Sequence, residues 1–368
     1  MSRWRLLAVA CMFLAGCDGG EAADTTVTSS IVATTVAPRV ATTLPPGTTA
    51  APSTTVAPTS TTTEAVYLDP DVLVVESFPV PAGSGPHDVA PAADGGVWYT
   101  AQNLGELGWL DPTTGETVHI PLGDGARPHG VIVDDSGTPW ITDGGLNAIV
   151  SVDPSTREVT VYSLPDDHPD ANLNTPVFAG DGRLWFTGQS GIYGLLDTGS
   201  GEMTVYDAPR GRGPYGITAT PDGDVYYASL AGSYVGKIEA GGAATILEPT
   251  NEGQGARRVW SDSAGAIWVS EWNSGSLSRY QPGSGEWATW PLSGERPAAY
   301  AVYVDEIDIV WVSDFGANAI VRFDPATEEM TTLALPSEPG EVRQIHGRTG
   351  EVWGAESAAD SLILIRTR

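Results

Sequence analysis

The chain has 368 residues and a formal net charge of −28, with only 18 basic residues. Phosphate backbones are bound through clusters of Lys and Arg, so this charge balance excludes a nucleic-acid partner. The 44 glycines, 28 prolines and 12 tryptophans predict many tight turns around an aromatic core.

Residues 1–16 are typical of an export signal, because Arg3 and Arg5 precede an apolar run that is too short to span a bilayer. The run ends in LAGC, at Cys17, which resembles the lipobox of bacterial lipoproteins. The resemblance implies cleavage before Cys17, acylation of its sulfur, and an extracytoplasmic protein held to the cell membrane by lipid. The alternative is an ordinary secretory signal with an incidental cysteine.

The composition changes sharply over residues 17–66, which are rich in Thr, Pro and Ala and contain no aromatic residue. Such a segment has no periodic apolar face and cannot bury a core. We therefore predict a disordered linker between the lipid and a folded domain at residues 67–368.

One sequence unit recurs through residues 67–368. Its centre is an aromatic residue, and successive aromatic residues are 41 to 45 positions apart. They are Trp98, Trp140, Trp185, Tyr226, Trp268, Trp311 and Trp353. Seven such units, rich in short strands, predict an all-β domain, a seven-bladed β-propeller with four strands in each blade. The recurring aromatic residue is more simply explained as core between blades than as a ligand contact.

The second unit illustrates the predicted strands. Residues 129–133 form the innermost strand, 138–142 the second, 148–152 the third and 158–164 the outer strand, with turn residues between them. The last unit lacks its outer strand, whereas residues 72–80 resemble an outer strand and precede the first unit. We therefore expect the N-terminal strand to complete the last blade and close the ring.

Two columns of the repeat are predicted to share one rim near the central pore, because the start of one antiparallel strand lies beside the end of the next. Eleven positions before the aromatic residue stand His87, His129, Asn174, Tyr215, Arg257, Tyr300 and Val342, with Arg343 beside it. Three positions after it stand Ala101, Asp143, Gly188, Ser229, Glu271, Asp314 and Glu356. Across the seven units, the residues in these two columns differ in type and many are polar, whereas the residues in the aromatic column are nearly identical. This difference indicates an asymmetric binding site.

The acidic residues of the second column suggest a metal site. Glu271, Asp314 and Glu356 fall in three consecutive blades, and carboxylates that face one cavity hold hard cations such as Mg²⁺ or Ca²⁺. Alternatively, these acids pair with Arg257 and Arg343, or cap N–H groups of the loops.

The unit RPHGVIVDDSGTPWITDGGLNAIVSVD, with GPHDVAPAADGGVWYT and GPYGITATPDGDVYYA, resembles the virginiamycin B lyase (streptogramin lyase) family over residues 67–368. The resemblance implies a monomeric seven-bladed propeller that linearises type B streptogramins, which are cyclic depsipeptide antibiotics, by Mg²⁺-dependent elimination. In that chemistry a general base removes a proton next to a carbonyl, the metal stabilises the enolate, and the ester oxygen leaves.

The family's site is a Glu-Pro-His triplet in the final blade, a Glu after that blade's Trp, and a second His one blade earlier. Glu341 matches the first Glu, and Glu356 matches the second with an offset of one residue. The base position, however, holds Arg343, which cannot act as a base at neutral pH, and Tyr300 stands in place of the second His. The predicted metal ligands are Glu271, Asp314, Glu341 and Glu356.

The remaining way to place the general base is a site rotated around the pore, in which the base lies in a different blade. His87 and His129 stand in Pro-His pairs of two adjacent blades, so they are the candidate catalytic residues, with Asp143 as the nearest acid. The alternative is that His129 only lines the pore. The candidate substrate-binding residues are Tyr215, Arg257, Tyr300, Arg343 and Asp143.

Two functions remain open. The first is a carbon–oxygen lyase that opens a cyclic depsipeptide or lactone ester, with Mg²⁺ as its cofactor. The second is a non-catalytic cell-surface propeller that binds a peptide, glycan or envelope partner at the pore rim. A hydrolytic lactonase is a distant third, because its metal ligands are not recognisable. In each case we expect a monomer on a lipid anchor, with no nucleic-acid partner.

Overall fold

The computed structural model describes residues 68–367. The predicted signal peptide (residues 1–16), the lipidation site Cys17 and the linker (17–66) lie outside the described residues. Within the described part of the chain, no helix has the length and apolarity needed to cross a membrane.

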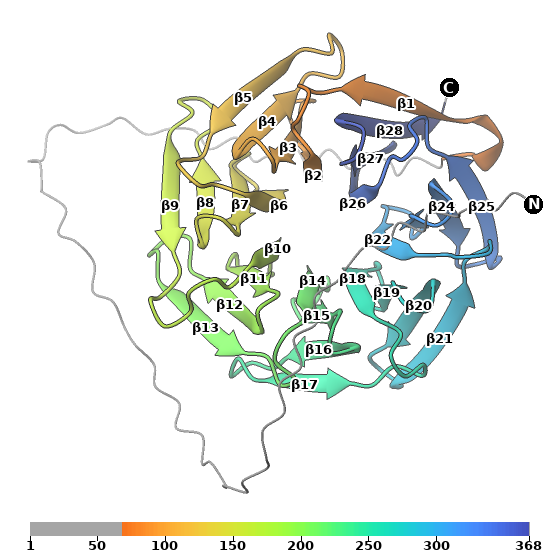
Figure 1. Cartoon of the computed structure of the whole chain (residues 1–368). Helices are drawn as coiled ribbons and strands as arrows, with labels where there is room; N and C mark the ends of the chain where they lie inside the picture. The colour runs from red at the N-terminus through yellow and green to blue at the C-terminus, as the bar shows by residue number, and fades with distance from the viewer. Residues whose placement is uncertain (1–67, 368) are drawn as a thin grey trace, which may run out of the picture. The chain divides into compact units, whose positions relative to one another are not determined.

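The described residues form seven four-stranded antiparallel sheets arranged in a ring, as the repeat predicts (Figure 1). From the pore outward, the first three blades are β2 (Pro86–Pro91), β3 (Val97–Ala101), β4 (Glu106–Leu110) and β5 (Thr117–Pro121); β6 (Pro128–Val133), β7 (Pro139–Asp143), β8 (Ala148–Val152) and β9 (Val159–Ser163); and β10 (Leu173–Phe178), β11 (Leu184–Gly188), β12 (Ile192–Leu196) and β13 (Met203–Asp207). The next three are β14 (Pro214–Ala219), β15 (Val225–Ser229), β16 (Tyr234–Ile238) and β17 (Ala244–Leu247); β18 (Ala256–Ser261), β19 (Ile267–Glu271), β20 (Ser276–Gln281) and β21 (Glu286–Pro291); and β22 (Ala299–Val304), β23 (Val310–Asp314), β24 (Ala319–Asp324) and β25 (Glu329–Ala334).

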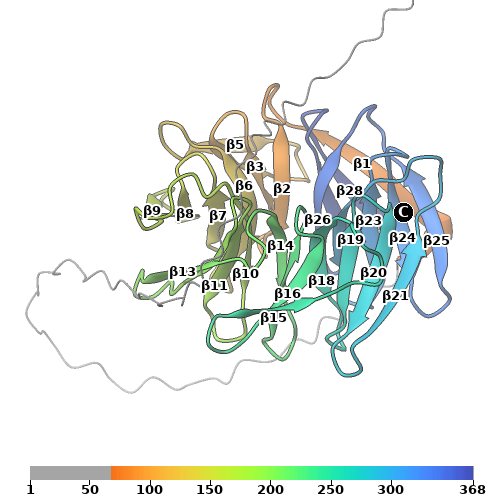
Figure 2. The ribbon, with the colours of Figure 1, turned by 60° about the horizontal axis from the view of Figure 1, so that its bottom comes forward.

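The last blade joins the two ends of the described chain. It consists of β26 (Val342–Arg348), β27 (Glu351–Glu356), β28 (Ser361–Thr367) and, outermost, β1 (Leu73–Pro79), which follows a short 3₁₀ helix, η1 (Pro70–Val72). β1 pairs with β28 in antiparallel register from Leu73↔Thr367 to Pro79↔Ser361. The prediction that the N-terminal strand completes the last blade is therefore confirmed, and Figure 2 shows β2 and β26 side by side at the closure.

The aromatic column lies in the core between blades. Trp268, Trp311 and Trp353 are fully buried, and the indole N–H groups of the first two donate to turn aspartates of their own blades, Asp262 and Asp305, each at 2.9 Å. A buried indole needs such a partner for its N–H, which explains why an Asp stands six positions before the Trp in these units. These tryptophans are core residues.

Candidate functional site

The seven innermost strands run in the same direction along the pore, so their second residues form one ring at one end of it (Figure 1). We call this ring the mouth. Its members are His87, His129, Asn174, Tyr215, Arg257, Tyr300 and Arg343. The last blade contributes Arg343 and not Val342, which pairs with Glu356 in the neighbouring strand.

A bulge in each innermost strand lets two consecutive residues reach the channel. The register shifts near the start of all seven strands, for example between Pro128 and Gly130 of β6. Bulges re-aim side chains in this way next to active sites. Hydroxyls of the second strands then fix the mouth: Thr100 Oγ1 donates to the carbonyl of His129 at 2.9 Å, across the blade boundary. The same bond is made to the mouth residue of the next blade by Thr142, Thr187 and Ser270, so in four blades this hydroxyl helps to position the mouth.

Two histidines from adjacent blades meet at the mouth. The His87 and His129 rings have centroids 3.7 Å apart, and both side chains are buried. His87 Nδ1 lies 2.8 Å from a carboxylate oxygen of Asp88, so Nδ1 carries the proton and Nε2 keeps its lone pair. His129 Nε2 lies 3.0 Å from the side-chain nitrogen of Asn174 and accepts its hydrogen. Of these two rings, His87 is therefore the one with a basic nitrogen that no residue among 68–367 occupies.

Both histidines are held neutral. Burial lowers the pKa of His87 well below its usual value, and the positive charges of Arg258, Arg343 and Arg257 lower it further. Burial likewise lowers the pKa of His129 far below its usual value, with a further contribution from His87. At pH 7 Nε2 of His87 is therefore unprotonated and keeps its lone pair.

The opposite side of the mouth carries an arginine among aromatic rings. The guanidinium of Arg257 lies 3.5 Å from the ring centre of Tyr300, 4.5 Å from that of Trp272 and 4.8 Å from that of Tyr215. Tyr300 also stacks on Phe315, with centroids 4.6 Å apart. Within the described chain no carboxylate comes within 4.0 Å of Arg257, so aromatic rings, and not an acidic side chain, surround its charge.

Tyr215 is the acidic phenol of this group. Its hydroxyl lies 2.5 Å from that of Tyr300 and 3.5 Å from a guanidinium nitrogen of Arg257. Burial alone raises the pKa of Tyr215, but the charges of Arg257 and Arg258 and the hydrogen bond with Tyr300 outweigh it, and the pKa falls below its usual value. Burial raises the pKa of Tyr300 instead, so of the two hydroxyls Tyr215 more readily carries negative charge.

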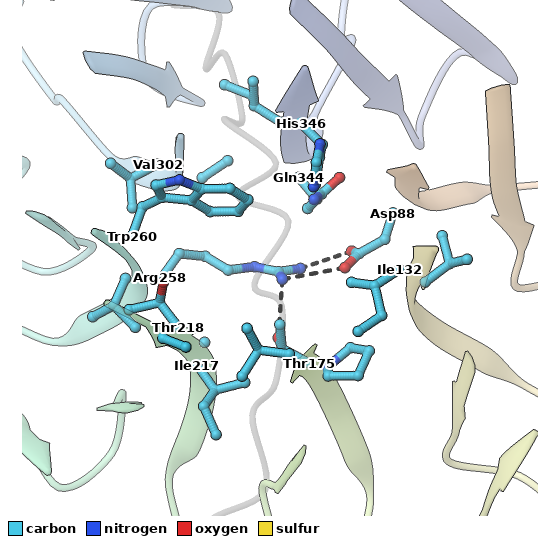
Figure 3. Close-up of a pocket in the computed structure, with 18 of the residues that line it drawn as sticks. Asp88, Ile132, Thr175, Ile217, Thr218, Arg258, Trp260, Val302, Gln344 and His346 are labelled. Carbon is cyan, nitrogen blue, oxygen red and sulfur yellow. Dashed lines mark hydrogen bonds and ion pairs between the residues drawn. The ribbon is translucent and has the colours of Figure 1, made fainter. Parts of the chain in front are cut away.

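An ion pair crosses the channel directly beneath the mouth (Figure 3). Arg258 donates to both oxygens of Asp88, at 2.7 and 3.2 Å, and to the hydroxyl of Thr175 at 2.9 Å. Asp88 and Arg258 are 1% and 4% exposed, so water screens neither charge. Asp88 thus orients His87 while Arg258 compensates the charge of Asp88.

The sequence reasoning missed this second layer. Asp88 and Arg258 follow the mouth residues His87 and Arg257 directly, at the position where two other units carry glycine. In those units a Cβ would collide with the next blade: at Gly130 it would lie 2.6 Å from the carbonyl oxygen of Asn174. An Asp and an Arg at a glycine position of the repeat were the signal that could have revealed the pair.

The acidic residues of the second column accept hydrogen bonds within their own blades. Asp143 Oδ1 accepts from the backbone N–H groups of Arg127, Gly145 and Leu146 at 2.8 to 2.9 Å, and Asp314 Oδ1 accepts in the same way from loop N–H groups. Asp143 pairs with Pro128, the residue before His129. It therefore lies beside the mouth, next to the residue before His129, and its part in substrate binding stays a prediction.

The remaining predicted metal ligands also have local partners, although Oε1 of Glu356 is buried without one among the described residues. Glu271 accepts from two serine hydroxyls at 2.6 Å, and Glu356 accepts from that of Ser337 at 3.0 Å. Burial raises the pKa of both carboxyls. Glu341 forms an ion pair with Arg343, the other predicted family position, at 3.0 Å. The family's base and acid positions therefore bind each other here.

These placements do not fit a common Mg²⁺ site. Among the residues that the structure describes, no three of the four predicted carboxylates have ligand atoms within 4.8 Å of one another. The one group that meets this distance is His87, Asp88 and His129. There the guanidinium of Arg258 already binds the carboxylate, so the positive charge at this site comes from the protein.

Comparisons with known proteins agree with this architecture. The sequence model of the Virginiamycin B lyase family matches residues 167–367. A streptogramin B lyase structure is 22% identical with a TM-score of 0.74, covering 81% of this chain and 99% of that one. Virginiamycin B lyase from Staphylococcus aureus is 18% identical with a TM-score of 0.75, covering 80% and 100%. The extracellular domain of a two-component system from B. thetaiotaomicron is 15% identical with a TM-score of 0.63, covering 81% and 43%. No curated protein sequence matches the chain.

Proposed function

Because the chain belongs to the virginiamycin B lyase family, we propose that it is a carbon–oxygen lyase that opens a cyclic depsipeptide or lactone ester by elimination at the mouth. The observation that carries this proposal is the His87–Asp88 pair. A histidine whose Nδ1 donates to a buried carboxylate has a fixed tautomer and a free Nε2, which is the arrangement of a general base.

In this proposal His87 removes a proton from the carbon next to a substrate carbonyl. The electrons form a carbon–carbon double bond, the bond from the neighbouring carbon to the ester oxygen breaks, and the ester leaves as a carboxylate that stays attached to the opened ring. Negative charge develops on the carbonyl oxygen in the transition state. Arg257 is the donor placed to stabilise it, because Arg257 has no carboxylate partner among residues 68–367.

The macrocycle of the substrate would pack on an aromatic wall of the mouth, which is formed by Trp272, Tyr300 and Phe315. Trp272 lies with its ring centre 5.6 Å from that of Tyr300 and 5.5 Å from that of Phe315, which gives a continuous apolar surface beside Arg257. Cyclic depsipeptides and substituted lactones combine apolar side chains with several carbonyl oxygens, and both features suit this wall. The type B streptogramins acted on by proteins of this fold are the first members of the class to test.

A specific observation favours the second candidate, a non-catalytic binding propeller. Arg343 occupies the family's base position and is bound to Glu341 at 3.0 Å, so the chain lacks the base where its relatives carry it. A mouth that binds a peptide or envelope ligand without turnover uses the same Arg257 and aromatic wall. Binding and turnover therefore have to be measured separately.

The test incubates the full-length chain with a type B streptogramin and a panel of macrolactones, with and without EDTA, and follows products by mass spectrometry. Elimination leaves the mass unchanged and adds a conjugated double bond, whereas hydrolysis adds the mass of one water. We expect ring opening without a mass change that persists in EDTA and that falls at least 100-fold in His87→Gln, since general bases contribute about 10²–10⁴-fold. Glu76→Gln, in an exposed ion pair far from the mouth, is the control.

Four results would contradict the proposal. Binding of substrate by calorimetry with no product in any condition favours the binding propeller. A product heavier by one water indicates a hydrolase. Full loss of activity in EDTA would show that the acids assemble around a metal after all, and activity that survives His87→Gln would remove His87 as the base.

A further inference from the structure

The channel continues beyond the Arg258–Asp88 ion pair as a separate cavity of about 250 Å³ (Figure 3). The ion pair and Thr175 lie between this cavity and the mouth, so a molecule in the cavity does not touch the proposed catalytic groups. The walls are mainly apolar. They include Ile132, Phe178, Ile217, Trp260 and Val302.

Two polar side chains on one strand face this cavity. Gln344 and His346 stand two residues apart on β26, and Figure 3 shows both beside the space next to Arg258. The Oε1 atom of Gln344 accepts from the backbone N–H of Val89 at 2.9 Å, which leaves the side-chain NH₂ as a donor with no protein partner among residues 68–367. The cavity therefore offers a fixed hydrogen-bond donor.

His346 supplies the matching acceptor. Its Nδ1 lies 3.1 Å from the carbonyl oxygen of Gly347, which can only accept, so Nδ1 carries the proton and Nε2 carries a lone pair. Burial lowers the pKa of His346, which keeps the ring neutral. Trp260 and Tyr303 contact the ring, with centroids 5.1 and 5.6 Å away, and hold it in place. In the described chain no side chain or backbone group bonds to Nε2 of His346.

Charge limits what can occupy the cavity. Arg258 is the only charged group of the lining other than Asp88, and the two compensate each other. A neighbouring pocket that shares Phe178 and Ala219 with the cavity is lined by four acidic residues: Asp262, Asp305, Glu306 and Asp308. These nearby carboxylates repel an anion, and an anion in the cavity would find no uncompensated positive charge.

We infer that this channel cavity binds a small neutral carboxamide or lactam with an aromatic or branched apolar body. Such a group presents a carbonyl to the NH₂ of Gln344 and an N–H to Nε2 of His346, while its body packs on Trp260 and the aliphatic walls. An apolar cavity of about 150 Å³ accommodates benzene, so 250 Å³ is sufficient for a one-ring amide. This inference does not depend on the proposed lyase activity, because the ion pair separates the two sites.

The test uses benzamide and benzoate, which have nearly the same shape but differ in charge and in the amide N–H. Binding to the full-length chain is measured by calorimetry and by ligand-observed NMR. We expect benzamide to bind and benzoate to bind at least tenfold more weakly. His346→Phe keeps the ring packing but removes the acceptor, and we expect it to weaken benzamide binding roughly fivefold to tenfold. Ile132→Trp fills the cavity and is expected to abolish binding.

Glu76→Gln, in the exposed ion pair with Arg366, is the control and should leave benzamide binding unchanged. The inference is overturned if benzamide does not bind, if benzoate binds as tightly, or if Ile132→Trp has no effect while the variant melts like the unmodified chain. If the unmodified chain binds benzamide but does not turn over streptogramins, the lyase proposal is refuted and the inference about the cavity stands.

Discussion

Replacing Asp88 by Asn tests whether the channel depends on a buried ion pair. The substitution removes one charge and leaves the guanidinium of Arg258 only 4% exposed, with its closest acceptor neutralised. Breaking a buried pair by removing one partner typically costs about 3–5 kcal/mol. In a domain of this size 1 kcal/mol corresponds to about 2 °C in Tm, so we expect the melting temperature to fall by roughly 6–10 °C. Calorimetry and urea denaturation of the purified chain measure both quantities.

The matched control is Glu76→Gln, because the Glu76–Arg366 pair has the same 2.7 Å separation but side chains 36% and 48% exposed. An exposed pair contributes at most about 1 kcal/mol, so this variant should melt within about 2 °C of the unmodified chain. The double variant Asp88→Asn, Arg258→Gln removes both charges and should recover a large part of the lost stability. If Asp88→Asn destabilises the chain no more than Glu76→Gln, or if the double variant is the sum of the singles, the ion pair does not organise the channel.

Three further predictions follow from the same geometry. Burial lowers the folded-state pKa of His87 and His129, so the unfolded chain takes up more protons than the folded chain as the pH falls below about 6.5, and the free energy of unfolding decreases on acidification. The variant with both histidines replaced by Gln should lose less unfolding free energy between pH 7 and pH 5, as measured by urea titrations. An identical dependence of the unfolding free energy on pH would contradict this prediction. Deleting residues 68–79 exposes the edge of β28 and should give concentration-dependent self-association in size-exclusion chromatography; a monomer with unchanged Tm would show that β1 does not close the ring. Thr142→Val removes a hydroxyl that bridges two blades by bonding Gly130 N–H and the carbonyl of Asn174, and should cost about 1–3 kcal/mol by denaturation, whereas a change within 0.5 kcal/mol would make the bridge dispensable.

The fold could be predicted from the sequence because its evidence is repeated seven times. The strands observed in the second blade, β6 to β9, agree with the predicted ranges to within one or two residues at each end. The missing outer strand of the last unit and the surplus strand before the first unit together specify how the ring closes. A turn Asp that receives the N–H of a buried Trp recurs as a pair at fixed spacing, so even the core contacts leave a pattern in the chain.

The site was only half predictable, for a geometric reason. The mouth ring follows from strand position alone, and all seven of its members were identified to within one residue. The local partners of the acids in the second column could not be predicted from the repeat: Asp143 pairs with Pro128, not with His129, and nearby N–H groups bind its carboxylate. The Asp88–Arg258 pair escaped notice because a bulge, which no periodicity reveals, turns two consecutive residues toward the channel.

The sevenfold arrangement explains how chemistry can move between blades while the fold stays the same. Each second residue of an innermost strand occupies an equivalent position around the pore, so a base in one blade can reach the same volume as a base in another. What distinguishes the positions is the residue that follows. His87 is followed by Asp88, which fixes its tautomer, whereas Arg343 is followed by Gln344, which bonds the backbone of a neighbouring strand and offers no carboxylate. A histidine restored at position 343 would therefore lack an orienting acid directly after it, and we expect Arg343→His to gain little turnover unless Glu341, released from its ion pair, takes that role.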